Sequence, residues 1–408
     1  MQQADVVVIG SGPAGLHAAI ELAKLGVSAI VLEREPEAGG VPLWCRHHTY
    51  PCRVKKRIFT GPDYARAWVK EAVALRVPIR TSTTVVSLDQ ENAGLTYTSP
   101  EGPGHLQARA ILLATGARES HRHQRLAAGD RADGIYTTAS VFQSAYSSRG
   151  LRQRNFVVYG AEDVSYSCVH VLRTHGARVL AALEPTPFAR SWRAAQFYFE
   201  RVCRIPHFFR VHDTTIHGNA SVNAITFTSE HEVRRIECDA VVFTGGFTPN
   251  SELIRPLSVD FNVASRGPSV NQHFETSVPW LFAAGNCLRG VVSGDEAALE
   301  GRRSAASIAD FLRSGIRSHK ARPIRLEGAL AYCCPNRLSP ACASVDSVSI
   351  WPAEHIRRGE LVVSAQGRVI WRKPVAAAQP GRRLFVPIAQ LLTHDADAYT
   401  ICLRPDSN

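Results

Sequence analysis

Hydrophobic residues at the start of the chain occur first as a continuous run and then at helical spacing. Residues 5–9 form a β-branched run, which is typical of a buried parallel strand. Residues 16–25 carry apolar side chains at helical spacing, and Gly26 follows where a glycine commonly ends a helix. Residues 28–32 form a second apolar run that ends at Glu33. The pattern predicts a strand, a helix and a second strand, the βαβ unit of an α/β fold.

The turn before this helix is rich in glycine. Gly10 allows a tight turn, Gly12 allows the backbone to approach a pyrophosphate, and Gly15 allows close packing of helix and strand. The helix N-terminus offers free N–H groups to phosphates. Glu33, 23 residues after Gly10, can accept hydrogen bonds from ribose hydroxyls. A glycine-rich turn without a ligand is the alternative. The preceding strand, the glycine pattern, the following helix and the acidic residue together favour a dinucleotide site.

A long segment, 34–61, separates this unit from a predicted helix at 62–75. Loops of this length are usually functional. It begins with Gly39-Gly40, which permits unusual backbone angles beside a cofactor. Further on it carries a set of potentially reactive or charged side chains: Cys45, Arg46, His47, His48, Cys52, Arg53, Lys55, Lys56 and Arg57.

Strands are expected at 79–88, 95–98 and 108–114, and the last of these leads into the sequence Ala-Thr-Gly-Ala at 114–117. A second βαβ pattern begins with a strand at 155–159. Its glycine turn is degenerate, because Glu162 and Ser165 stand at the second and third glycine positions. A carboxylate at the second position would oppose a pyrophosphate by volume and charge. We therefore predict a dinucleotide-binding fold in which NAD(P) binding is doubtful.

The remaining pattern returns to the first domain and then changes character. A strand at 236–244 is expected to re-enter the first domain, and a strand at 280–283 leads into Gly285-Asn286. A long helix is expected at 295–313. From about residue 325 the runs are short, β-rich and separated by turn residues, which is typical of a small all-β module. Its strands are expected at 345–351, 361–365, 369–373 and 399–403.

Composition narrows the class of protein. The 408 residues are 45% hydrophobic and 20% charged, as in a globular protein of two or three domains. The net charge of +11 is spread along the chain without a nucleic-acid module, so no nucleic-acid partner is expected. The ten cysteines lack the spacing of a disulfide framework. With no membrane-length apolar run and no signal peptide, we expect a cytoplasmic protein that has no membrane partner.

Three motifs together resemble the flavoproteins with two dinucleotide-binding domains: residues 1–35, the segment 114–117 and the segment 283–286. Longer stretches, among them GGVPLWCRHH, EDVSYSCVHVL and AALEGRR, resemble the α subunits of opine oxidase, D-hydroxyproline dehydrogenase and hydrogen cyanide synthase. The resemblance implies FAD as cofactor and oxidation of a C–N bond in a small amino or imino acid, alone or beside a second flavoprotein subunit. Iron–sulfur members need four cysteines. Here Cys333, Cys334 and Cys342 offer three, and we predict no metal site.

The motifs and the resemblance assign residues to cofactor binding. The residues at the ends of the predicted strands and in the adjoining turns are Gly10, Gly12, Pro13, Ala14, Gly15, Glu33, Arg34, Gly40, Val41, Val85, Ala114, Thr115, Gly116, Gly285, Asn286 and Ala297. The catalytic candidates lie in the long segment. His47 is expected as a base, Arg46 or Arg53 as the partner of a substrate carboxylate, and Cys45 as a group that modulates the flavin. Packing beneath the flavin or exposure to solvent is the alternative for each of them.

Two other functions remain open. Cys45 and Cys52 suggest dithiol–disulfide exchange or an NAD(P)H-dependent flavin reductase, although six residues separate them and Pro51 stiffens the segment. A subunit that carries FAD without catalysing oxidation is also possible. The expected fold is α/β, with two Rossmann-like, glutathione-reductase-like domains. We place the FAD-binding domain at 1–118 and 238–322, the degenerate NAD(P)-binding-like domain at 119–237 and the C-terminal β-rich domain at 323–408.

Overall fold

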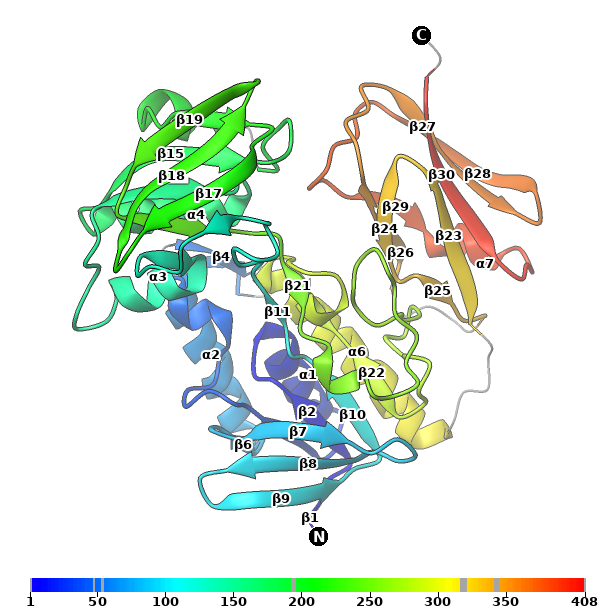
Figure 1. Ribbon diagram of the computed structural model, residues 1–408. Helices are drawn as coiled ribbons and strands as arrows, with labels where there is room; N and C mark the ends of the chain where they lie inside the picture. Colours follow the sequence, from blue (N-terminus) through cyan, green and yellow to red (C-terminus); the bar gives the residue numbers. More distant parts are fainter. Residues whose placement is uncertain are drawn as a thin grey trace. The chain divides into compact units, whose positions relative to one another are not determined.

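The computed structural model describes residues 2–46, 48–52, 55–191, 196–315, 321–340 and 345–406 (Figure 1). The chain forms two compact units. One unit combines Met1–Ala117 with Thr248–Asn408, and the other is Arg118–Phe247. The second unit is thus an insertion in the first, and the short strands β11 (Ala117–Arg118) and β21 (Thr248–Pro249) stand at the two crossings.

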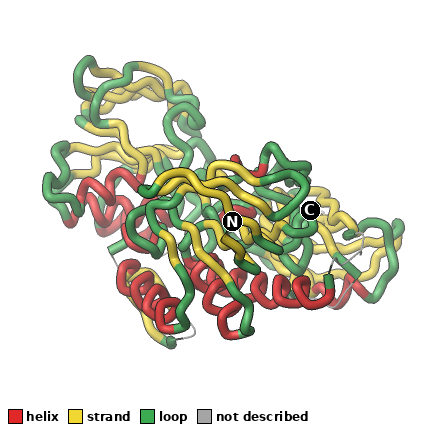
Figure 2. The backbone as a smooth tube through the Cα atoms, turned by 90° about the horizontal axis from the view of Figure 1, so that it is seen from below, coloured by secondary structure: helices red, strands yellow, loops and turns green. Residues whose placement is uncertain are grey.

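The first unit is organised around a five-stranded parallel sheet. Its strands run in the order β22 (Leu281–Ala283), β10 (Ala110–Leu113), β2 (Val6–Ile9), β3 (Ala29–Leu32) and β6 (Ile79–Arg80). Every residue of the first four strands is buried, which explains their continuous apolar runs. The longer helices described in this unit are α1 (Pro13–Lys24), α2 (Gly61–Ala74) and α6 (Gly294–Ser314). Figure 2 shows helices along one side of the strands.

The order of these strands creates a topological switch point. From β2 the chain proceeds through α1 to β3 and through α2 to β6, and it then returns on the other side of β2 to form β10. In open α/β sheets, ligands bind at the carboxyl ends of the strands where the order reverses. The gap between the ends of β2 and β10 is therefore the expected ligand position.

An antiparallel meander is inserted between β6 and β10. Its sheet has the order β1 (Gln2–Gln3), β9 (Gly102–Gln107), β8 (Gly94–Ser99) and β7 (Thr84–Leu88). The single strand expected at 79–88 is therefore wrong. Residues 79–80 and 84–88 belong to different sheets, and between them Ser82 has a φ of 49° that interrupts extended backbone.

The long segment after β3 is more ordered than a loop. Its elements are the 3₁₀ helix η1 (Val41–Trp44) and the antiparallel hairpin of β4 (His48–Cys52) and β5 (Arg57–Thr60). The helix α2 then begins after Thr60, whose hydroxyl accepts a hydrogen bond from the Asp63 N–H. The hairpin was not expected, because polar and apolar residues do not alternate regularly along its two strands.

The second unit contains two sheets. A parallel sheet has the order β13 (Ile135–Thr137), β20 (Ala240–Phe243), β14 (Asn155–Tyr159), β15 (Arg178–Glu184) and β16 (His207–Phe209). A second sheet has the order β12 (Ala128–Gly129), β17 (His212–Gly218), β18 (Val222–Ser229) and β19 (Glu232–Glu237). Helical segments that the structure describes in full here are α3 (Thr138–Ala145), α4 (Asp163–Thr174) and the π-helical η2 (Tyr198–Val202).

The strand expected at 236–244 does not re-enter the first domain. β20 instead lies between β13 and β14 in the parallel sheet of the second unit, and all four of its residues are buried there. The strand is apolar throughout because its side chains are buried on both faces of the sheet. A run of that kind does not reveal which sheet a strand joins.

The C-terminal part of the first unit is β-rich, as predicted. One sheet has the order β25 (Arg337–Leu338), β23 (Arg322–Gly328), β30 (Tyr399–Pro405), β27 (Gly359–Ala365) and β28 (Arg368–Val375). The other has the order β24 (Leu330–Cys334), β26 (Ser347–Pro352) and β29 (Leu384–Pro387), with α7 (Ile388–Leu392) after it. The two sheets share one apolar core. Residues 322–406, the C-terminal module, therefore have a core of their own.

Candidate cofactor-binding site

The turn between β2 and α1 requires glycine at two positions. Gly10 has a φ of +102°, and a Cβ there would lie 2.6 Å from the carbonyl oxygen of Ala114. A Cβ on Gly15 would lie 1.9 Å from the carbonyl oxygen of Gly10 and 3.2 Å from Val8 Cγ1. Both positions therefore serve the packing of strand, turn and helix.

Gly12 differs from these two glycines. It is the residue before α1, its φ of −67° suits any L residue, and a Cβ there would have no heavy atom within 4 Å. Neither backbone conformation nor internal packing explains a glycine at this position. Close approach of a ligand to the backbone does explain it, and the N–H groups at the start of α1 provide the polarity that a pyrophosphate needs. The residues present therefore fit the phosphates of a dinucleotide.

Glu33 follows β3 and is buried beside the same turn. Its carboxylate accepts hydrogen bonds from Ser11 N at 2.8 Å, Ser11 Oγ at 2.6 Å and Glu35 N at 2.9 Å. A carboxylate has about four lone-pair sites, so one remains for a ribose hydroxyl. Arg34, in contrast, is exposed and its Nε lies 3.2 Å from a carboxylate oxygen of Glu35. The structure thus fixes Glu33 at the turn and turns Arg34 to solvent.

The neighbouring strand ends complete this edge of the sheet. Leu113 of β10 is in register with Ile9 and with Ala283, so the turns that follow the three strands lie side by side. Gly116, with a φ of +71°, again has no heavy atom within 4 Å of a Cβ. Thr115 is tied to the loop after β21, because its hydroxyl donates to the Asn250 carbonyl at 2.6 Å.

Asn286 lies in the loop after β22, in the 3₁₀ helix η4 (Gly285–Leu288). Its Oδ1 accepts a hydrogen bond from Val292 N at 3.0 Å, which leaves its Nδ2 group as a donor. Ala297 is buried in the first turns of α6. Val85 lies in β7 of the antiparallel meander, which is a separate sheet from the one that carries the turns.

Gly40 brings the start of the long segment to the phosphate turn. Its φ is +68°, and a Cβ there would lie 2.7 Å from Gly12 Cα. Val41 follows it and is exposed at the start of η1. The segment that carries the catalytic candidates thus departs directly from the predicted cofactor site.

The catalytic candidates are described only in part. Cys45 follows η1 and is half-buried, and its carbonyl accepts a hydrogen bond from Gly61 N at 2.8 Å. Burial and the nearby Cys45 raise the pKa of Tyr50 well above its usual value. Arg46 is exposed. His47, Arg53 and Cys342 lie outside the described residues, and the same holds for the side chain of His48.

Cys52 lies in a different environment from Cys45. It is buried in β4 opposite Arg57 and belongs to the apolar core, where it faces Tyr64. Both cysteines are thiols. Cys45 lies beside Tyr50 and Cys52 beside Tyr64, and the ring centres of these two tyrosines are 5.5 Å apart.

The degenerate turn of the second unit makes a hydrogen bond equivalent to one in the glycine turn of the first unit. Ala161 N donates to Glu184 Oε2 at 2.9 Å, just as Ser11 N donates to Glu33. At the second glycine position, however, Glu162 Oε1 accepts a hydrogen bond from Gly246 N at 3.0 Å, and burial raises the pKa of Glu162. A side chain with a carboxylate thus lies at the N-terminus of α4. These residues do not fit a pyrophosphate.

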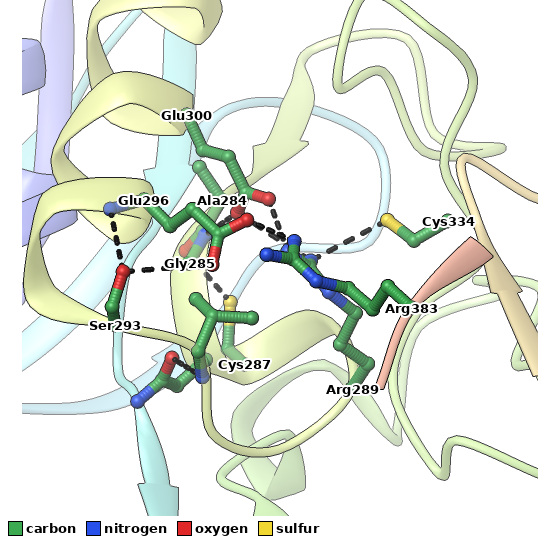
Figure 3. Close-up of polar contacts among 11 residues, drawn as sticks. Ala284, Gly285, Cys287, Arg289, Ser293, Glu296, Glu300, Cys334 and Arg383 are labelled. Atoms are coloured by element: carbon green, nitrogen blue, oxygen red, sulfur yellow. Dashed lines mark hydrogen bonds and ion pairs between the residues drawn. The ribbon is translucent and has the colours of Figure 1, made fainter. Parts of the chain in front are cut away.

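A buried ion pair beside the loop after β22 was missed by the sequence reasoning. Arg289 pairs with Glu300 of α6 (Figure 3), and only 2% of the Arg289 side chain is exposed. Glu300 was part of the AALEGRR motif, but nothing in its spacing from Arg289 predicts an ion pair.

No helix among the described ranges combines the length and apolar character needed to cross a membrane.

Comparisons with known proteins agree with this fold. Residues 4–304 match the family model described as pyridine nucleotide-disulphide oxidoreductase. A thioredoxin reductase of Treponema pallidum (strain Nichols) is 25% identical over 320 residues, which cover 76% of this chain and 98% of the relative.

Solved structures show the same architecture. The thioredoxin reductase of T. acidophilum has a TM-score of 0.62 at 19% identity, and the match covers 77% of this chain and all of that one. An L-proline dehydrogenase from P. horikoshii has a TM-score of 0.57 at 17% identity, and the match covers 78% of this chain and 57% of that one. At such identities the likeness shows the fold alone.

Proposed function

The chain belongs to the pyridine nucleotide-disulphide oxidoreductase family, and from this premise we propose that it oxidises the C–N bond of a small amino or imino acid. Members of the family are oxidoreductases that bind FAD. The cofactor class and the general reaction type follow from membership. The substrate class and the source of the electrons are our proposal.

The observation that carries the proposal is Glu162 at the nucleotide position of the second unit. Its carboxylate accepts the Gly246 N–H at the N-terminus of α4, where a family member that uses NAD(P)H needs room and positive potential. A flavoprotein without a working NAD(P)H site must receive its electrons from another donor. The resemblance to the opine oxidase, D-hydroxyproline dehydrogenase and hydrogen cyanide synthase α subunits supports an amino or imino acid as that donor.

We propose three residues of the chain for this reaction, two that act on the substrate and one that contacts the flavin. Oxidation converts a C–N single bond to C=N with loss of one hydride and one proton, and FAD, when bound, supplies the hydride acceptor. His47 is proposed as the base that receives the proton. Arg46 is proposed to bind the substrate carboxylate, since its guanidinium offers paired donors. Cys45, beside Tyr50, is proposed to contact the flavin.

Anaerobic mixing with a panel of amino and imino acids tests this function. At least one compound of the panel should abolish the visible absorbance of the bound flavin. Arg46→Lys should raise the concentration needed for half-maximal reduction, because a point charge replaces a bidentate partner, and His47→Asn should slow reduction while FAD stays bound. Reduction at an unchanged rate in His47→Asn would refute that residue's role.

Two outcomes would favour the alternatives. If the flavin is reduced only after co-expression with a second flavoprotein subunit, the chain is an FAD-bearing subunit whose partner performs the oxidation. If NADPH reduces the flavin rapidly, the protein resembles the thioredoxin reductase of Treponema pallidum in activity as well as in sequence. A long-wavelength charge-transfer band that disappears in both Cys45→Ser and Cys52→Ser would establish dithiol chemistry.

A further inference from the structure

Arg289 is a buried cation with partners in two parts of the first unit. It follows η4, and its guanidinium pairs with the Glu300 carboxylate through two contacts, of which Nη1–Oε2 measures 3.4 Å. The same Nη1 lies 3.4 Å from Cys334 Sγ, and the guanidinium carbon lies 5.4 Å from the centre of the Trp351 ring. Cys334 and Trp351 belong to β24 and β26 of the C-terminal module.

Glu300 connects this cation to the predicted cofactor site. Its Oε2 accepts a hydrogen bond from Gly285 N at 2.9 Å, so the carboxylate holds the loop that begins the Gly285-Asn286 motif (Figure 3). Gly285 in turn packs on the first turn of α1, since a Cβ there would lie 2.8 Å from Ala14 Cβ. The next residue of α6, Gly301, packs against the carbonyl of Ala14 at a Cβ distance of 2.0 Å.

A second arginine links the module to the start of α6. Arg383 pairs with Glu296 in the first turn of that helix (Figure 3). The guanidinium carbon of Arg383 lies 5.6 Å from the Trp351 ring centre. Trp351 also stacks on Tyr332 at 4.7 Å. One aromatic side chain of the module therefore lies beside both cations, and each cation pairs with a carboxylate of α6.

We propose that the C-terminal module is part of the FAD site, and that it acts through Arg289 and Glu300 as positioning residues for the Gly285-Asn286 loop. This inference rests on the proposed cofactor role of that loop. Glu300 is partly buried and Arg289 is almost fully buried, and a charge in such a place is costly unless it is paired. Pairing with Arg289 therefore keeps the Glu300 carboxylate where it accepts the Gly285 N–H. Trp351 and Cys334 fix the Arg289 side chain, which makes the geometry of the loop depend on the module.

The test separates loss of folding from loss of positioning. Glu300→Leu removes the carboxylate that neutralises the buried Arg289 and should lower the Tm of the apoprotein. Replacing both residues, Arg289→Met with Glu300→Leu, should restore the Tm, because apolar side chains of similar volume commonly replace a buried ion pair without loss of stability. FAD affinity, measured by quenching of free-flavin fluorescence, should stay weaker than in the wild type by about tenfold or more, which is about 1.4 kcal/mol.

The role of the module is tested by a double-mutant cycle on FAD affinity. Trp351→Leu should weaken FAD binding, and its effect should be much smaller when Arg289→Met and Glu300→Leu are already present, since the residues act as one unit. A matched control is Arg303→Lys, which alters another pair between α6 and the module. Arg303 pairs with Asp346, but that aspartate is 92% exposed, so FAD affinity should not change.

Asn286→Ala distinguishes failure of this inference from failure of the proposed site. If Asn286→Ala weakens FAD binding while the folded double variant binds FAD as tightly as the wild type, the loop contacts FAD and the positioning role is refuted. If neither variant affects FAD binding, the Gly285-Asn286 loop does not belong to the cofactor site, and the proposed site itself is refuted. Additive effects of Trp351→Leu and the double variant would refute the coupling between the module and the loop.

Discussion

Replacement of Gly12 by alanine separates ligand approach from protein packing. The Cβ of Gly12→Ala has no heavy atom within 4 Å, and the φ of −67° is allowed for any L residue. Alanine is a poorer residue than glycine before a helix, while it also reduces the entropy of the unfolded chain by about 0.4–1 kcal/mol. The two effects oppose each other, so the free energy of unfolding of the apoprotein should change by less than about 1 kcal/mol. This corresponds to a Tm shift of about 2–4 °C at most.

FAD binding should respond very differently. The added methyl group would lie on the side from which the pyrophosphate is expected to approach the backbone. We expect the FAD dissociation constant to rise by about tenfold or more, equal to about 1.4 kcal/mol. Titration of the apoprotein with FAD, followed by flavin fluorescence, measures the constant, and thermal unfolding of the same sample without FAD measures the stability.

Gly15→Ala is the matched control for this reasoning. Its Cβ would lie 1.9 Å from the Gly10 carbonyl oxygen, so the apoprotein itself should lose about 1–3 kcal/mol or more. Gly12→Ala should therefore weaken FAD binding without lowering the Tm of the apoprotein, whereas Gly15→Ala should do both. A Gly12→Ala protein that binds FAD as the wild type does would show that no ligand approaches this backbone, and the placement of the cofactor would be wrong.

Three further predictions concern other parts of the chain. Burial, followed by the charges of Arg302, Lys24 and Lys55, lowers the pKa of His17 from 6.5 to about 3. The unfolded chain takes up this proton below pH 6.5 and the folded chain does not, so stability should fall as pH drops from about 6.5 toward 3. The expected loss in the free energy of unfolding at pH 5.5 is about 1.4 kcal/mol. Denaturant titrations at several pH values should show this loss in the wild type and not in His17→Leu. If the variant loses stability with falling pH as steeply as the wild type does, His17 is not the group responsible. Glu162→Gly should gain calorimetrically detectable NADH binding that the wild type lacks, and binding by the wild type itself would show that the carboxylate does not block the site. Cys52→Ser should cost about 1–3 kcal/mol of stability, since it places a hydroxyl in an apolar core, yet leave the rate of flavin reduction unchanged; loss of reduction in a folded variant would favour dithiol chemistry.

The elements that could be predicted from the sequence are those whose residue types follow from burial or backbone conformation at the position itself. Val6–Ile9 and Ala110–Leu113 are apolar throughout because both faces of the parallel sheet are buried. Gly10 is required by its own φ of +102°, and Gly15 is required by its close contact with the Gly10 carbonyl oxygen. The second unit's degenerate turn was likewise visible, since Glu162 stands at a position where glycine is expected. Local constraints of this kind leave a signature in a single sequence.

Features that depend on distant partners were missed. β20 was assigned to the first domain, because an apolar strand carries no mark of its sheet. The hairpin of β4 and β5 mixes polar and apolar residues without regular alternation, and its register shifts between His48 and Tyr50. Arg289 and Glu300 are eleven positions apart and meet only because η4 and the start of α6 fold together beside the module. Long-range pairing of this kind has no period that a pattern of residues can show.

We propose that electrons enter this flavoprotein from an amino or imino acid and not through the second unit. Anaerobic stopped-flow mixing of the purified holoprotein with NADH, with NADPH and with the amino and imino acid panel tests it directly, because flavin absorbance reports electron entry from every donor in the same way. We expect the flavin to stay oxidised with both nicotinamides and to be reduced by at least one member of the panel. Rapid reduction by NADH or NADPH, with no reduction by any amino or imino acid, would contradict it.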